Sequence, residues 1–125
     1  MALLGRMRHV FLLPIVAVLL ADVTGCDSIC ENEQIANVAS PSGAARAIVF
    51  HRNCGATTGF NTQVSVLPMA KQLPNDGGNA LIVDGSVPLQ VRWTSESRIL
   101  VSGYGQAKIF KQESIVGGVA VTYAN

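Results

Sequence analysis

The sequence predicts a mainly β protein, a small antiparallel β-sandwich or rolled sheet of about seven strands behind an N-terminal signal helix. Two observations support this fold class. Short segments rich in β-branched and aromatic residues alternate with turn signals made of Gly, Pro, Asn, Asp and Ser. After residue 30, no window shows the sustained apolar period of 3.6 residues that an amphipathic helix requires.

The predicted strands are taken in chain order, and each is bounded by a turn signal. Before the first of them, residues 30–38 favour a helical turn or two. The N-D-G-G run at 75–78, the D-G pair at 84–85 and the G-Y-G run at 103–105 separate later strands. The strands are expected at residues 46–52, 62–67, 80–83, 89–94, 98–102, 107–111 and 119–123.

Two of these strands alternate apolar and polar side chains. In the strand at 89–94, Leu89, Val91 and Trp93 alternate with polar residues, so we expect Trp93 to be mostly buried. The strand at 62–67 has the same period, which predicts that Gln63 and Ser65 face water. Each strand is therefore expected to bury one face and expose the other.

The first 25 residues have the features of an export signal. Arg6 and Arg8 precede an uncharged apolar run of twelve residues at 10–21. A membrane-spanning helix needs about 20 apolar residues, whereas the apolar part of a secretory signal needs only about 7–15. The sequence therefore predicts a signal peptide over 1–25.

The stretch from Val23 to Cys26, V-T-G-C, resembles the lipobox of bacterial lipoproteins. The resemblance implies cleavage before Cys26 and acylation of its sulfur, often with acylation of the new amino group as well. Two or three acyl chains anchor a protein durably, where a single chain would be marginal. Asp22 departs from the motif, which usually has an uncharged residue there. Ordinary signal-peptidase cleavage, with Cys26 left as a thiol, is the alternative.

The resemblance to a lipobox also implies a cellular location and domain boundaries. The protein would be a palmitate-bearing lipoprotein of the bacterial cell envelope, facing the periplasm or the cell exterior. Asp27 resembles the signal that keeps enterobacterial lipoproteins in the inner membrane. The expected division is a signal peptide at 1–25, a lipid-anchored linker at 26–39 and a β domain at 40–125.

The other two cysteines have two interpretations. If Cys26 is acylated, Cys30 and Cys54 remain as an even pair in an oxidising compartment, which favours a disulfide. Cys30, His51 and Cys54 could instead contribute three ligands to a metal. A zinc site would need a fourth ligand, and such loose spacing is uncommon. We therefore favour the disulfide and expect no metal and no cofactor.

The stretch C-G-A-T-T-G-F at 54–60, together with the strand that follows it, resembles an uncharacterised family of small bacterial envelope proteins. The resemblance supports only the fold and the compartment. The loop has two interpretations: a turn with demanding geometry, or a partner-binding loop with Thr57, Thr58 and Phe60 as contacts. A disulfide between Cys30 and Cys54 would hold this loop at the membrane-proximal end of the domain.

Composition and motifs argue against catalysis and against nucleic acid. The chain has nine basic and eight acidic residues without a basic stripe, so no nucleic-acid partner is expected. It has no G-x-S-x-G, H-E-x-x-H or P-loop, and His51 is the only histidine after the signal segment. The sequence therefore predicts a non-catalytic module that presents a loop or a sheet edge to another envelope protein. The alternative is a small-ligand or metal binder around Cys30, His51 and Cys54.

Overall fold

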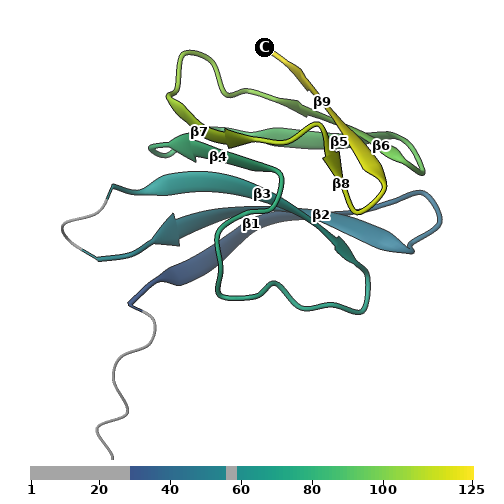
Figure 1. Cartoon of the computed structure of the whole chain (residues 1–125), viewed down its shortest axis with the longest axis horizontal. Coiled ribbons are helices and arrows are strands. Elements are labelled where there is room, and N and C mark those ends of the chain that lie inside the picture. The colour runs from purple at the N-terminus through teal and green to yellow at the C-terminus, as the bar shows by residue number, and fades with distance from the viewer. Residues whose placement is uncertain (1–28, 56–58) are drawn as a thin grey trace, which may run out of the picture.

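The computed structural model describes residues 29–55 and 59–125 and consists, in these residues, of strands and turns. Figure 1 shows two stacked sheets, so the predicted mainly-β class is confirmed. The larger sheet has the order β1-β2-β3-β4-β7, and the smaller sheet has the order β5-β6-β9-β8. The strands are β1 (Glu31–Ala39), β2 (Ala45–Asn53), β3 (Asn61–Pro68), β4 (Leu81–Asp84), β5 (Gln90–Ser95), β6 (Arg98–Ser102), β7 (Ile109–Gln112), β8 (Ile115–Val116) and β9 (Val119–Ala124).

The seven predicted strands correspond to β2 through β7 and β9, while β1 and β8 are additional. The helical turns expected at 30–38 are wrong, because β1 pairs with β2 from Glu31 opposite Asn53 to Ala39 opposite Arg46. Residues 31–39 of the expected linker therefore form a strand of the domain. The pairing is antiparallel throughout both sheets, except that β6 and β9 run parallel.

The main core lies between the two sheets. Alternate residues of the strands point inward, and the inward set is dominated by valine. The buried members are Ala47, Val49, Val64, Val66, Ala80, Leu81, Val83, Leu89, Ile99, Val101, Val119 and Val121.

A second, smaller core lies on the outer face of the larger sheet. Ile48, Phe50 and Leu67 are buried there against Leu73, which belongs to the connection between β3 and β4. We call residues 69–79 of this connection the strap. In Figure 1 it runs under the larger sheet, on the side away from the smaller sheet. The strap covers a face that the strand pattern alone assigned to water.

Polar side chains fasten the strap to β3. Gly78 N–H donates to Gln63 Oε1 at 2.6 Å, and Asn79 N–H donates to Ser65 Oγ at 3.1 Å. The Asn79 side chain pairs with both backbone groups of Val66 at 2.8 Å, as a neighbouring strand would. Gln63 and Ser65 are consequently buried, and the prediction that they face water is wrong.

Trp93 is partly exposed but packs against the main core, which agrees with the prediction that it is mostly buried. It lies on β5, which is the outermost strand of the smaller sheet, and a neighbouring strand is missing on one side. Its indole Nε1–H donates to the carbonyl of Val38 on β1 at 2.8 Å. Trp93 thus joins the edges of the two sheets and packs partly against the core.

Candidate binding groove

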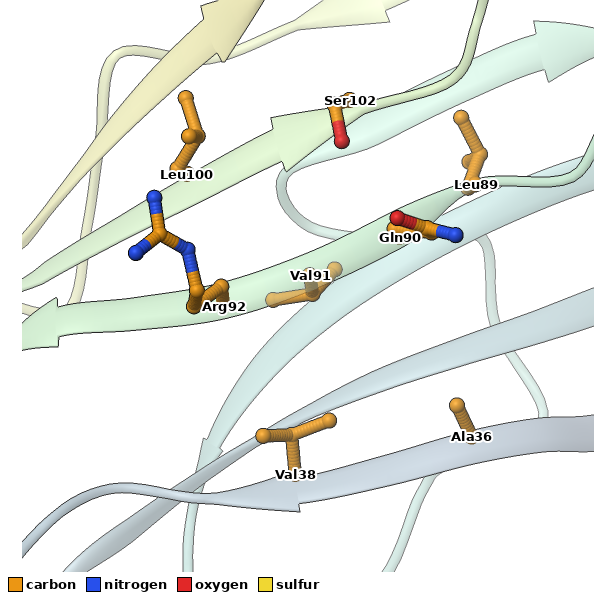
Figure 2. Close-up of a pocket in the computed structure, with 8 residues that line it drawn as sticks. All are labelled: Ala36, Val38, Leu89, Gln90, Val91, Arg92, Leu100 and Ser102. Carbon is orange, nitrogen blue, oxygen red and sulfur yellow. The ribbon is translucent and has the colours of Figure 1, made fainter.

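A groove lies where the edges of the two sheets face each other. β1 ends the larger sheet and β5 ends the smaller one. Between them is an open cavity of about 430 Å³. Figure 2 shows Ala36 and Val38 on β1 across from the side chains of β5. The lining residues are Ala36, Val38, Leu89, Gln90, Val91, Arg92, Leu100 and Ser102.

The β1 wall of the groove offers backbone groups as well as apolar side chains. The Ser40 N–H donates to the Ala45 carbonyl, so in this register Val38 also directs its backbone groups to β2, and its carbonyl accepts the Trp93 indole as a second bond. In an antiparallel pair, every second residue has its N–H and C=O directed to the same side. Asn37 lies between Ala36 and Val38 in a regular part of the register, so its backbone groups point to the free edge.

The other wall carries one charge. Arg92 is exposed on β5, and among the described residues its guanidinium has no hydrogen bond or ion pair. Its neighbours Leu89 and Val91 are apolar, and Gln90 is exposed beside it. An arginine beside an apolar wall is suited to a carboxylate carried by an otherwise apolar partner segment, because a guanidinium can donate two parallel hydrogen bonds to it.

A carboxylate joins the β1–β2 hairpin to the β5–β6 hairpin at one end of the groove. Glu96, in the turn between β5 and β6, accepts from Ser40 Oγ at 3.0 Å and from Ser42 N–H at 2.8 Å, and it also accepts from Ser42 Oγ. The Ser42 hydroxyl and then the Ser42 N–H hold the pKa of Glu96 below its ordinary value, because both favour the ionised form. Together with Trp93, this contact fixes the spacing of the two edges.

The predicted disulfide is present. Cys30 and Cys54 are bonded across the start of β1 and the end of β2, 24 residues apart in the chain. Bonded sulfurs supply no thiolate to a metal. In the described ranges, no three His, Cys, Asp or Glu side chains are grouped to hold an ion.

The other predicted site residues are only partly described. Thr57, Thr58 and the acylation site Cys26 lie outside the described residues. Phe60 has 37% of its surface exposed, and its ring centroid lies 4.6 Å from that of His51. The structure therefore brings Phe60 and His51 together beside the disulfide, at a distance from the groove along β1 and β2.

Sequence reasoning missed the β1 wall of the groove. Ala36 and Val38 fall in the segment that was expected to be a linker with helical turns. No period of two marks this segment as a strand, because Ala39 is apolar like Ala36 and Val38. Arg92 was correctly predicted to lie on the exposed face of its strand, but its place in one groove with Ala36 and Val38 depends on how the sheets stack.

Comparisons with known proteins add no further constraint. No family model matches the chain, and searches of curated proteins and of solved structures found no significant match. The described part of the chain also contains no helix that is long and apolar enough to cross a membrane. The function is therefore argued from the groove and from the N-terminal motif.

Proposed function

We propose that the protein is a lipid-anchored bacterial cell-envelope protein that acts as a non-catalytic interaction module. The groove between β1 and β5 would receive a segment of a partner envelope protein. The observation that carries this proposal is the combination, in one groove, of an apolar wall, an edge strand and an arginine that pairs with none of the described residues. The V-T-G-C motif at 23–26 supports the anchor and the envelope location.

The chemistry of the groove favours binding over catalysis. Among its described lining residues, Ser102 carries the single hydroxyl, and none is a histidine or a carboxylate that could activate it. An extended peptide segment fits the groove better, because a free strand edge can pair with backbone while alternate side chains enter an apolar wall. A carboxylate on that segment would meet Arg92.

A small ligand is the second candidate. Ligand cavities commonly enclose roughly 300–1,000 Å³, and the groove volume falls in the lower part of that range. The earlier form of this candidate, a metal held by Cys30, His51 and Cys54, does not suit an oxidised pair of cysteines. A small apolar molecule with a carboxylate would use the same residues as a peptide.

The anchor is tested with Cys26→Ala. The native protein should incorporate labelled palmitate and partition into detergent, and the variant should lose both properties. The variant should accumulate as uncleaved precursor or as soluble protein. Native protein that carries no label and stays in the aqueous phase would contradict the lipoprotein assignment.

The groove is tested by affinity capture of the native protein from its own membranes, followed by mass spectrometry. Arg92→Glu should remove the specific partner, because the charge facing the groove is reversed. Lys71→Glu is the matched control, since Lys71 is an exposed basic residue on the strap. Loss of the partner in both variants, or in neither, would argue against the groove as the binding surface.

A further inference from the structure

Exposed apolar side chains gather at the end of the sandwich that carries the disulfide. Seven large apolar side chains are exposed among the described residues. Four of them lie at or next to the starts of β1, β3 and β7, which are on the left in Figure 1: Ile29, Phe60, Ile109 and Phe110. Ile29 is 67% exposed and Phe110 is 54% exposed, so each presents more than half of its surface to solvent.

Backbone contacts link these residues across the sheet. Gly85 N–H donates to the Phe60 carbonyl at 2.7 Å, which joins the start of β3 to the end of β4. Asp84 N–H donates to the Lys108 carbonyl at 2.9 Å, which brings the start of β7 beside the same end of β4. Ile29 lies on the opposite side, next to Gly55 and the disulfide. The apolar groups are therefore carried by a rigid framework.

Lys108 lies beside the exposed aromatic ring of Phe110, an arrangement that is common at the membrane–water interface. Its ammonium lies 5.2 Å from the centroid of the exposed Phe110 ring. Lysine side chains at a membrane surface keep the ammonium in the headgroup layer while the stem covers apolar surface, and aromatic rings are common at the same depth. Asp84 is also at this end, so the local charges balance and anionic lipid is not required.

The segment from Cys26 to Cys30 is short, and its length limits how far the disulfide end of the domain can lie from the membrane. Cys26, the proposed acylation site, precedes Cys30 by four residues, which span at most about 14 Å when fully extended. Cys30 is bonded to Cys54 and begins β1 at its neighbour, so the tether ends on the sheet itself. An acylated Cys26 would hold this end, and no other, close to the lipid headgroups.

We propose that the disulfide end of the domain rests on the bilayer that holds the anchor, with Ile29, Phe60 and Phe110 in contact with lipid and Lys108 in the headgroup layer. This inference rests on the proposed acylation of Cys26. It assigns Phe60 to lipid contact, in place of the partner contact that the sequence predicts. The groove between β1 and β5 then opens sideways, above the membrane surface.

Three exposed side chains are enough to orient the domain on the bilayer, because the acyl anchor already holds the domain at the membrane surface. A short flexible tether gives an effective concentration on the order of millimolar or higher, so a contact too weak to recruit a free protein still orients a tethered one. The acyl chains supply the attachment, and the apolar end supplies the orientation.

The test uses the full-length protein, purified with its acyl chains and placed in phosphatidylcholine vesicles with or without bromine on the acyl chains. Phe60→Trp places an indole at the proposed contact, and Phe110→Trp does so independently in case the first variant fails to fold. Ile115→Trp is the control: Ile115 is 69% exposed and lies near Glu113, which bonds to Ala80 at the far end of β4. The native protein, with Trp93 alone, gives the baseline.

Brominated lipid should quench the added indole of Phe60→Trp and of Phe110→Trp about two-fold or more, since interfacial side chains reach ~5–10 Å into the headgroup and acyl boundary. The added indole of Ile115→Trp should remain unquenched. Equal quenching at both ends, or none at Phe60→Trp and Phe110→Trp in acylated protein, would overturn this inference alone; the second result would leave that end to a protein partner. Absence of acyl mass on Cys26 would contradict the proposed function and the inference together.

Discussion

The outer faces of the two sheets differ in what lies over them. The strap covers the larger sheet and buries Ile48 and Phe50 on its outer face. The outer face of the smaller sheet has no such cover among the described residues, and Leu100 is only half-buried there. Similar alternating strands thus give a closed structural face in one sheet and an accessible face beside the groove in the other.

The polar residues of β3 and β5 show what the difference means. Gln63 and Ser65 on β3 fasten the strap and are buried, whereas Gln90 and Arg92 on β5 are exposed at the groove. A polar side chain on a strand can serve stability or binding, and the segment packed over it decides between them. We propose that the larger sheet is the scaffold and that the edge of the smaller sheet is the binding side.

The largest expected effect compares the apolar residues on the two outer faces. Phe50→Ala should lower the free energy of unfolding by about 3–5 kcal/mol, because Phe50 is fully buried beneath the strap. Leu100→Ala should cost less, about 1–2 kcal/mol, since its side chain is only partly buried. Urea unfolding curves measure both. A similar loss of unfolding free energy in the two variants would show that the two outer faces do not differ in burial as described.

The next effect concerns the polar residues on the same two faces. Asn79→Ala should destabilise the fold by about 1–3 kcal/mol, because it leaves both backbone groups of Val66 without their partner. Gln90→Ala should change stability by less than about 0.5 kcal/mol, as expected for an exposed side chain. The midpoints of thermal unfolding give the comparison. A neutral Asn79→Ala would show that the strap is not held by these bonds.

The smallest effect concerns Glu96, which links the two hairpins at the surface. Its pKa is lowered in the folded state, first by the Ser42 hydroxyl. Its contribution to stability is therefore present above the ordinary glutamate pKa of 4.5 and is lost as the pH falls through the lower folded value. Glu96→Gln should remove this part of the acid dependence while leaving the neutral-to-alkaline limb unchanged. An identical acid limb in both proteins would contradict the assignment.

Much of the fold follows from local sequence. The β-branched segments and the Gly-containing turns identify seven of the strands, and the cysteine count identifies the disulfide. β1 was missed because Glu31, Asn32, Glu33 and Gln34 have weak strand propensity, and their strand conformation comes from pairing with β2. Pairing between distant segments is not visible in a local window.

The candidate site was harder to predict than the fold. The burial of Gln63 and Ser65 depends on a strap whose course no periodicity encodes. The groove depends on the stacking of two sheet edges, which brings Arg92 and Ala36 to one cavity although the two lie far apart in the chain. Sequence could supply the exposed arginine and the alternating wall residues separately, but their apposition is a property of tertiary structure.

Site-specific photo-crosslinking in the native membranes tests the central claim most directly. A photoreactive residue at Gln90 samples the groove, and the same residue at Gln72 samples the exposed surface of the strap. The account predicts a discrete protein adduct at Gln90 that disappears when Arg92→Glu is added, and no adduct at Gln72. An adduct at Gln72, or an adduct at Gln90 that persists with Arg92→Glu, would contradict the assignment of the groove as the partner surface.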